Sequence, residues 1–387
     1  MEAYLDNAAT TKVFPQVKDI MMQVMEEDFG NPSSKHTKGM DAEKYITQAK
    51  EQIAASLKCQ PKEIIFTSGG TESNNMALIG TAMANKRAGK HIITTRIEHA
   101  SVHEPFAYLE QMGYETTYLP VDKNGHVVPE ALEEAVREDT LFVSIMMVNN
   151  EMGALEDIKA LSDLIKKKNP KTIFHVDGIQ AYGKYKIIPK KLGVDLLSVS
   201  GHKIHGPKGV GFLYVKDGTK ISPILFGGGQ QKGMRSGTEN VPGIAGLGEA
   251  VKVMYENQNE KVQKLYELKR HFVDGICQLE EVTVNGLEGI ELTETAPHII
   301  SVSFAGIKSE VMLHALAQKG VFVSSGSACS SNHPELSGTL KAIGVEDELL
   351  DSTLRYSFSV TTTQEEVDYA IAVTKEVLPQ LRRFIKK

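Results

Sequence analysis

Seven short apolar segments alternate with stretches of helical periodicity in the first part of the chain. They are rich in Ile, Val, Leu and Phe and lack strict polar alternation, which is typical of strands buried on both faces. Because strand, helix and strand follow in series, we predict an α/β domain with right-handed crossovers and a mostly parallel seven-stranded sheet. The predicted strands are residues 63–67, 91–95, 116–119, 141–148, 172–176, 195–199 and 210–215.

The pattern changes after about residue 245. Residues 246–279 form a long amphipathic stretch, which predicts one helix leading out of the sheet domain. Further short strands (298–304, 321–323, 353–358) and helices (309–318 and from 364) then predict a smaller α+β domain. No Pro- or Ser-rich linker separates the two parts, so we expect tight packing. We predict a large domain at 14–258 and a small domain from 1–13 and 259–387.

Composition excludes several classes of protein. The 387 residues carry 43 Lys+Arg and 49 Asp+Glu without a basic block, which argues against nucleic acid or an anionic membrane as the main partner. Three cysteines, at positions 59, 277 and 329, exclude a disulfide framework and a four-cysteine zinc site. The N-terminus lacks a secretory apolar core and no apolar run could span a membrane, so we expect a cytoplasmic protein.

Two predicted strands end in residues that suit a pyridoxal phosphate site. Lys203 follows the strand at 195–199 inside a Gly-rich turn, and ligands of α/β sheets bind at the carboxyl ends of strands. Its amine could form a Schiff base if a partly dry pocket lowers its pKa. Asp177 ends the strand at 172–176 and could keep a pyridinium nitrogen protonated. Taken alone, the position of Lys203 is better explained by an ordinary surface lysine, and a helix-capping aspartate is as compatible with Asp177 as the cofactor role.

Other polar residues also follow predicted strands. Residues 67–74 read TSGGTESN and open a helix, which favours a phosphate site, although a plain capping turn fits as well. His99 could stack on a cofactor ring or shuttle a proton, and Asn150 supplies an amide after the most apolar strand. His99 and His103 have the i, i+4 spacing of a metal pair, but no further ligand motif accompanies them, so we predict no metal site.

Two residues of the predicted small domain are candidates for catalysis or substrate binding. Cys329 lies in SSGSACSSNHPELSG, a run of small and turn-forming residues that predicts an exposed, mobile loop at about 324–338. Its thiol is a candidate nucleophile, and a merely structural thiol is equally compatible. Arg355 lies in the predicted strand at 353–358, where it could bind a carboxylate or be an ordinary exposed residue.

Eight motifs then follow in the order of one known family. They are LDNAATT from residue 5, SGGTESNN, IEHAS, VNNEMG, HVDGIQ, SGHKIHGPKG, MRSGT and SSGSACSS. With Arg355 they cover residues 5–355, and the sequence resembles the NifS/IscS-like cysteine desulfurases of the class-V aminotransferase family. The resemblance implies the PLP-dependent transferase fold (fold type I).

The resemblance implies a role for each residue that matches a family motif. Lys203 would form the Schiff base with PLP, Asp177 would pair with the pyridine nitrogen and His99 would stack on the ring. The remaining cofactor contacts would come from Gly70, Thr71, Asn150, Gln180, Ser200 and His202. Thr238 would reach the phosphate of the neighbouring subunit, which implies a homodimer.

The implied reaction converts L-cysteine to L-alanine. Arg355, together with Asn150, would hold the substrate carboxylate, Lys203 would move the Cα proton, and Cys329 would accept the sulfur as a persulfide. The mobile loop would carry it to a separate acceptor protein, for iron–sulfur cluster assembly or for thiolation of tRNA or cofactors.

Two departures from the family pattern affect only local packing near the ring. They are Lys12, where proline is frequent, and the pair Gly178-Ile179, where smaller residues are usual. A selenocysteine lyase or an aminotransferase is the nearest alternative, and a thiol in this loop argues against transamination. A non-catalytic sulfur carrier would not need Lys203, Asp177 and His99, and a metal-dependent hydrolase built on His99 and His103 has the least support.

Overall fold

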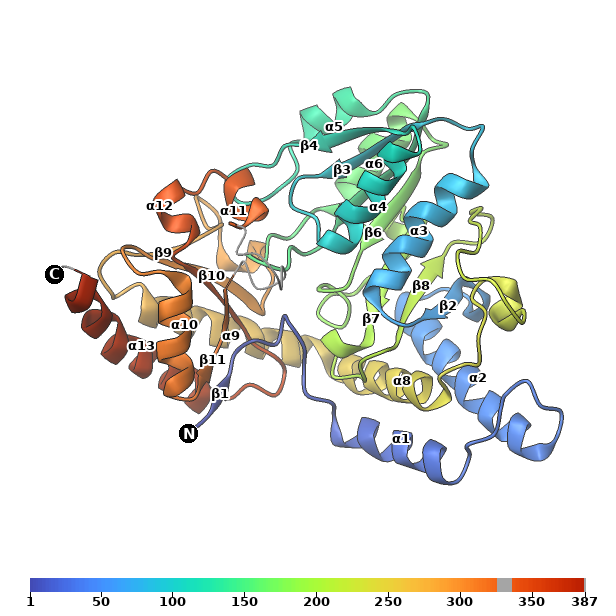
Figure 1. Ribbon diagram of the computed structural model, residues 1–387, viewed down its shortest axis with the longest axis horizontal. Helices are drawn as coiled ribbons and strands as arrows, with labels where there is room; N and C mark the ends of the chain where they lie inside the picture. The colour runs from blue at the N-terminus through green and yellow to red at the C-terminus, as the bar shows by residue number, and fades with distance from the viewer. Residues whose placement is uncertain (326–335, 386–387) are drawn as a thin grey trace.

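The computed structural model describes residues 1–325 and 336–385 and has two parts, each built around a sheet (Figure 1). The larger part contains a seven-stranded sheet in the order β2-β8-β7-β6-β5-β3-β4. Its strands are β2 Ile64–Thr67, β3 His91–Thr95, β4 Glu115–Leu119, β5 Thr140–Met146, β6 Ile173–Asp177, β7 Leu196–Ser200 and β8 Gly211–Val215. β8 runs antiparallel to β2 and β7, and the other neighbours are parallel. The predicted α/β class and mostly parallel sheet are confirmed.

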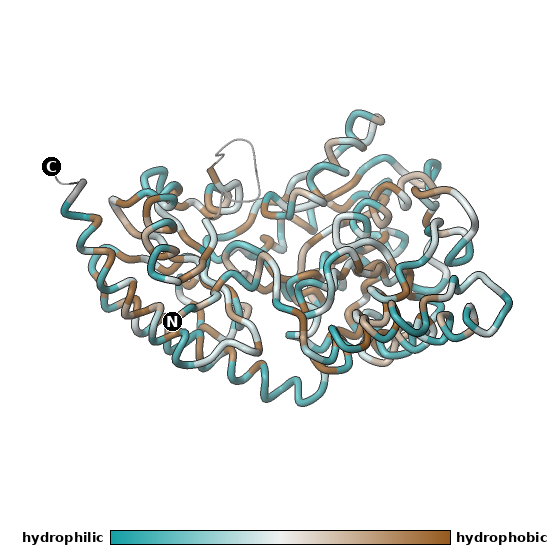
Figure 2. The backbone as a smooth tube through the Cα atoms, turned by 60° about the horizontal axis from the view of Figure 1, so that its bottom comes forward, coloured by the Kyte–Doolittle hydropathy of each residue, from teal (hydrophilic) through white to brown (hydrophobic). Residues whose placement is uncertain are grey.

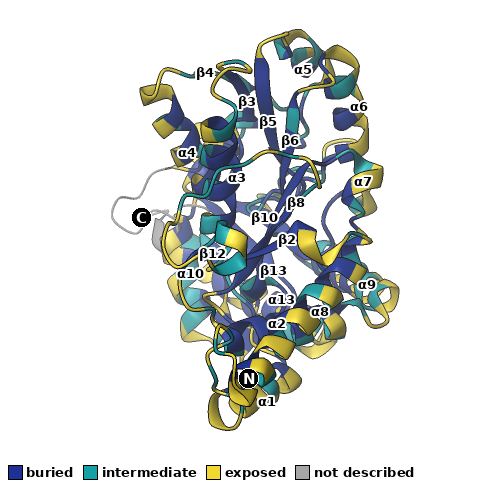
Figure 3. Ribbon diagram, turned by 90° about the vertical axis from the view of Figure 1, so that its right-hand side faces the viewer, coloured by how far each residue is buried: buried dark blue, intermediate teal, exposed yellow. Residues whose placement is uncertain are grey.

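Helices cover both faces of this sheet, which explains why its inner strands are buried. Ile92 and Ile93 are adjacent on β3 and both fully buried, but they belong to different hydrophobic clusters. Because neighbouring strand residues point to opposite faces, a strand covered on both sides favours consecutive apolar residues, whereas the edge strand β4 (ETTYL) is more polar and more exposed. Figure 3 shows the buried strands at the centre and the exposed surfaces on the helices around them. These helices are α3 Gly70–Ala84, α4 Ala100–Gln111, α5 Pro129–Ala135, α6 Ile158–Lys168 and α7 Pro189–Leu192.

Three further helices pack together beside the sheet. α1 (Pro15–Glu26) and α2 (Thr37–Leu57) both lie against α8 (Val241–Tyr255). The prediction of one helix over 246–279 is wrong, because α8 ends at Tyr255 and a separate helix, α9, spans Gln258–Ile276. Asn257 breaks the helix with a left-handed backbone (φ 50°), which asparagine tolerates better than most residues.

The smaller part contains an antiparallel four-stranded sheet in the order β12-β13-β10-β9. A two-stranded parallel sheet pairs β1 with β11 beside it. The strands are β1 Ala3–Tyr4, β9 Val282–Val284, β10 Ile299–Phe304, β11 Val321–Phe322, β12 Ser324–Ser325 and β13 Thr353–Ser357. The helices are α10 Ser309–Gln318, α11 Gly338–Ala342, α12 Asp347–Leu350 and α13 Gln364–Ile385. Apolar residues of α9, α10 and α13 form one buried cluster with this sheet.

Short 3₁₀ helices complete the described residues: η1 Pro61–Glu63, η2 Gly201–Lys203, η3 Gln230–Gly233 and η4 Leu292–Glu294. Figure 2 shows hydrophobic segments concentrated inside both parts and hydrophilic segments along the outer helices. None of the helices in the described part of the chain has the length and apolarity that crossing a membrane requires.

The N-terminal segment connects the two parts. We call residues 6–11 the strap. At one end Asp6 forms a β-bridge with Ser357 of β13, and at the other the N–H of Thr11 donates to the carbonyl of His202, just after β7. The strap therefore crosses from the small sheet to the carboxyl edge of the large one, and the candidate site lies along it.

Candidate active site

Most of the predicted site residues meet at the carboxyl edge of the seven-stranded sheet. Asp177 and Ser200 are the last residues of β6 and β7, and Lys203 ends the 3₁₀ turn that follows β7. The helices α3 and α4 begin beside them, at Gly70 and just after His99. Residues scattered over the sequence are brought together because parallel strands present their carboxyl ends at one edge.

A cavity of about 380 Å³ lies at the N-terminus of α3. Its lining residues are Ala9, Thr10, Ser68, Gly69, Gly70, Thr71, Glu72, Ser200, His202, Lys208 and Gly209. Gly69 adopts φ 147° and ψ −170°, a backbone conformation that is essentially restricted to glycine. The predicted phosphate contacts Gly70, Thr71, Ser200 and His202 therefore share one cavity with the free N–H end of a helix, where anions are favoured.

The Asp177 carboxylate is buried and held by two donors. Its Oδ1 accepts from the N–H of Ile179 and its Oδ2 from Nδ2 of Asn74, both at 2.9 Å. Burial raises the pKa of Asp177 despite these hydrogen bonds, which favour the charged form. A cation placed against this carboxylate would therefore stabilise it strongly.

His99 is connected to Asp177 through two side chains. Its Nδ1 accepts from the N–H of Ser101 at 3.1 Å and lies 2.8 Å from the Ser101 hydroxyl, so His99 caps α4. Nδ2 of Asn74 donates to that hydroxyl oxygen at 2.9 Å as well as to Asp177. Burial, with smaller contributions from Lys203 and Arg355, lowers the pKa of His99, so its ring is neutral near pH 7 with the proton on Nε2.

Sequence reasoning missed Asn74 and Ser101. Asn74 is part of the quoted SGGTESNN motif and lies four residues after Gly70, hence one helical turn along α3. Ser101 belongs to the quoted IEHAS motif, directly after the N-cap of α4. Both residues lie inside quoted motifs, and that position could have marked them as site residues. Short polar side chains at the start of a helix are, however, usually interpreted as caps.

Lys203 lies against the strap. Its Nζ donates to the carbonyls of Ala8 at 2.6 Å and Ala9 at 2.7 Å, and Nε2 of Gln180 donates to the same Ala8 carbonyl at 2.9 Å. Behind it, Nζ of the buried Lys184 donates to the Lys203 carbonyl at 2.8 Å. Burial, followed by the charge of Lys203, lowers the pKa of Lys184 to about 7.

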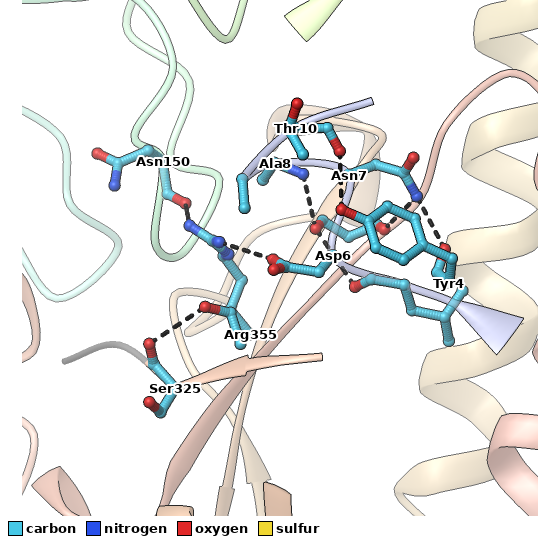
Figure 4. Close-up of polar contacts among 12 residues, drawn as sticks. Tyr4, Asp6, Asn7, Ala8, Thr10, Asn150, Ser325 and Arg355 are labelled. Carbon is cyan, nitrogen blue, oxygen red and sulfur yellow. Dashed lines mark hydrogen bonds and ion pairs between the residues drawn. The ribbon is translucent and has the colours of Figure 1, made fainter. Parts of the chain in front are cut away.

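Arg355 reaches the same region from β13 of the small sheet. Its side chain is 8% exposed, and Nη1 donates to the Asn150 carbonyl at 2.8 Å while Nη2 contacts Oδ1 of Asp6 at 2.9 Å (Figure 4). A strand of one part, a loop of the other and the strap thus converge on one guanidinium group.

Some predicted residues do not join this group. Thr238 is exposed in the loop before α8 and is not among the residues that line the cavity. Cys329 lies outside the described residues. His103 stacks on Tyr118, with ring centroids 6.2 Å apart, and within residues 1–325 and 336–385 no cluster of three or more His, Cys, Asp or Glu could hold a metal ion.

Comparisons with known proteins agree with this geometry. The chain is 44% identical over 382 residues to a cysteine desulfurase IscS of Dictyoglomus turgidum, a match that covers 98% of this chain and 95% of that protein. A solved NifS-like protein superposes with a TM-score of 0.92 at 38% identity, covering 98% of this chain and all of that one. A structure described as SspA in complex with cysteine matches with a TM-score of 0.78 at 31% identity, over 93% of this chain and all of that one.

The family model described as aminotransferase class-V matches residues 3–370. The resemblance drawn from the eight sequence motifs is thereby confirmed, together with the fold that it implied. The chain belongs to the class-V aminotransferase family.

Proposed function

We propose that this chain is a PLP-dependent cysteine desulfurase, which takes sulfur from L-cysteine, releases L-alanine and carries the sulfur as a persulfide on Cys329. The observation that carries the proposal is the near-complete match to proteins named cysteine desulfurase, in a chain that brings Lys203, Asp177 and Arg355 to one sheet edge. Neither Lys203 nor Asp177 would be needed by a passive sulfur carrier.

The residues at this edge fit PLP. A buried carboxylate whose pKa is raised suits a protonated pyridine nitrogen, and the cavity at the start of α3 suits a phosphate. One oxygen of Asn74, Oδ1, is buried beside Asp177 and has no hydrogen-bond partner in the described part of the chain. Gly69 and Gly70 bring the backbone close to the space that a phosphate would take.

PLP, when bound, supplies an electron sink for the pair left when the substrate Cα proton is removed. Asp177 would hold the ring nitrogen in its protonated form, and Asn74 would orient Asp177. His99 would cover the ring face, and Gly70, Thr71, Ser200 and His202 would bind the phosphate. Gln180 and Asn150 would contact the oxygen side of the ring.

Lys203 and Arg355 would act on the substrate. Lys203 would hold the Cα proton on Nζ, and the carbonyls of Ala8 and Ala9 would stabilise the protonated amine. Arg355 and Asn150 would bind the carboxylate. The Cys329 thiolate would attack the substrate sulfur, so that an S–S bond forms while the C–S bond breaks, and the carbon takes up a proton and leaves as alanine.

The proposal includes a homodimer in the cytoplasm, with Thr238 directed at the phosphate site of the second copy. Its exposure, outside the lining of its own cavity, supports that role. The sulfur would pass to acceptor proteins for iron–sulfur clusters or for thiolation. We also propose the domain division at 14–258 against 1–13 and 259–387.

The test is sulfide and alanine release from L-cysteine by the wild type, Cys329→Ala and Lys203→Ala, with Cys277→Ala as the matched control because Cys277 is exposed on the surface. We expect the control to keep full activity and both site variants to lose sulfide release. Cys329→Ala should retain the visible absorbance of bound PLP. Sulfide release by Cys329→Ala at the wild-type rate would contradict the persulfide, and unchanged release by Lys203→Ala would contradict the cofactor assignment.

A further inference from the structure

The quoted motif LDNAATT forms the strap, and the roles above use only its carbonyls. Its first polar residue, Asp6, carries the carboxylate that pairs with Arg355. Several hydrogen bonds fix this part of the chain to β13, where the N–H of Ala8 donates to Oγ of Ser357 at 2.8 Å and Nδ2 of Asn7 donates to the Ser357 carbonyl at 3.0 Å. Ser357 and Arg355 are two residues apart on one strand and so share a face.

The contacts of Arg355 leave part of its guanidinium available. The group has five N–H donors, of which the Asn150 carbonyl takes one and Oδ1 of Asp6 takes another. Among residues 1–325 and 336–385, Nη1 and Nη2 have no other hydrogen-bond partner, so each keeps one N–H that could bind a carboxylate. The Nε of Arg355 is buried and also has no hydrogen-bond partner within these residues, so the guanidinium is not held in the orientation that would satisfy all its donors there.

Asp6 is the carboxylate that holds this orientation. Glu151 is nearby, but its side chain accepts from the hydroxyls of Ser337 and Thr339, and burial raises its pKa. Among residues 1–325 and 336–385, Asp6 is the one acidic side chain within ion-pair distance of Arg355. The pair is mostly buried, with side-chain exposures of 8% for Arg355 and 21% for Asp6, so water competes weakly for its hydrogen bond.

The strap also links Arg355 to Lys203. Asp6 contacts the guanidinium, and the carbonyls of Ala8 and Ala9, a few residues along, accept from Nζ of Lys203. One short, hydrogen-bonded segment therefore touches both cations. The strap therefore connects the position of the guanidinium with the position of the lysine amine.

We propose that Asp6 is a positioning residue that orients Arg355 for the carboxylate of the amino-acid substrate. The inference rests on the proposed function, because it takes Arg355 as the carboxylate anchor. Two properties of Asp6 can be separated by substitution. Asp6→Asn keeps an oxygen acceptor and removes the charge, whereas Asp6→Ala removes both.

The experiment uses the PLP-loaded enzyme and compares ligands with and without a carboxylate. For wild type, Asp6→Asn and Asp6→Ala we would measure KM and kcat with L-cysteine, and the dissociation constants of L-alanine and of cysteamine, which has no carboxylate. Asp19→Asn, an exposed aspartate on α1, is the control. We expect Asp6→Ala to raise KM and the L-alanine dissociation constant about tenfold, to change kcat less than threefold, and to leave cysteamine binding unchanged.

Asp6→Asn keeps an oxygen acceptor for the guanidinium. Its KM, its kcat and its dissociation constants for L-alanine and cysteamine should therefore stay within threefold of the wild type. Equal weakening of L-alanine and cysteamine by Asp6→Ala would overturn the proposal, and so would an unchanged or lowered KM. If the wild type releases no sulfide from L-cysteine, the proposed function fails, while the two binding constants still test Asp6. If Asp6→Ala does not fold, Asp6→Asn alone tests the proposal. A tenfold loss of L-alanine affinity in Asp6→Asn would overturn the orienting role of Asp6. An L-alanine affinity within threefold of the wild type would support that role.

Discussion

The amide of Asn74 donates a 2.9 Å hydrogen bond to the buried carboxylate of Asp177. Replacing Asn74 by leucine removes this donor at nearly constant volume, so the pKa of Asp177 should rise further and the carboxylate should hold a pyridine nitrogen less well. We expect PLP affinity to fall about tenfold, in line with the loss of one hydrogen bond to a charged group. Titration of the apoenzyme with PLP measures it. Asn75→Leu is the control because the side chain of Asn75 donates to the Thr71 carbonyl of its own helix, and an equal loss in both variants would contradict the role of Asn74.

Gly211 controls the shape of the cavity at the start of α3. A Cβ at this position of β8 would lie 2.5 Å from the Val199 carbonyl and 2.9 Å from Cα of Gly69, so alanine must push β8 or the glycine turn aside. We expect Gly211→Ala to destabilise the protein by about 1–3 kcal/mol and to weaken PLP binding. Gly338→Ala is the control because no atom of residues 1–325 or 336–385 lies within 4 Å of a Cβ there. Urea unfolding measures the free energy of unfolding, and titration with PLP measures the affinity for the cofactor. If Gly211→Ala matches the wild type in both, the prediction is wrong.

His175 should make the large sheet sensitive to acid. Its ring bridges Ser144 on β5 and Ser198 on β7, at 2.8 and 2.9 Å, and burial lowers its pKa to about 3. An unfolded histidine takes up a proton below about pH 6.5, whereas the folded one does not, so stability should fall as the pH drops from about 6.5 towards 3. We expect His175→Gln to be less stable at pH 7.5 but to lose less stability per pH unit, by up to about 1.4 kcal/mol. Urea unfolding at pH 7.5 and 5.5 gives the slopes, with the exposed His314→Gln as control; parallel slopes for wild type and His175→Gln would refute the assignment.

Lys184 should support catalysis from behind Lys203. Its Nζ is the donor to the Lys203 carbonyl, and methionine would fill the same space without donating. We expect Lys184→Met to bind PLP normally and to lower kcat about tenfold, because the backbone that carries Lys203 loses a hydrogen bond. The exposed Lys186→Met is the matched control. If Lys184→Met has the same kcat as Lys186→Met, Lys184 does not support catalysis.

The sheet was predictable because packing on both faces imposes a local signal. Ile92 and Ile93 are buried on opposite faces of β3, and apolar runs of this kind mark the inner strands. The ends of all seven predicted strands lie within two residues of those observed, including the more polar edge strand β4. The break between α8 and α9 was not predictable, because Asn257 adopts a left-handed backbone without a glycine or proline nearby. Tertiary packing there overrides a continuous amphipathic pattern.

The location of the candidate residues was predictable where a reactive side chain follows a strand, as at Asp177 and Lys203, and their catalytic roles stay predictions. Asn74 and Asp6 were missed as site residues because their importance comes from partners distant in sequence. Asn74 lies 103 positions from Asp177 and Asp6 lies 349 positions from Arg355, and no local pattern encodes such contacts. The sequence alone does not indicate a chemical role for a short polar side chain in a helix or at a strand end. Such a role can be inferred only when the fold shows which residues the side chain contacts.

The strap also dictates when the site can form during synthesis. Asp6 and Ala8 leave the ribosome 349 residues before their respective partners, Arg355 and Ser357. The large sheet can fold while the chain is still growing, since its strands end at Val215. Asp6 and Ala8 therefore have no access to these partners until β13 has been synthesised. Closure of the strap is a contact of very high sequence separation, and a nascent chain cannot position Arg355 through Asp6 before that strand has been made.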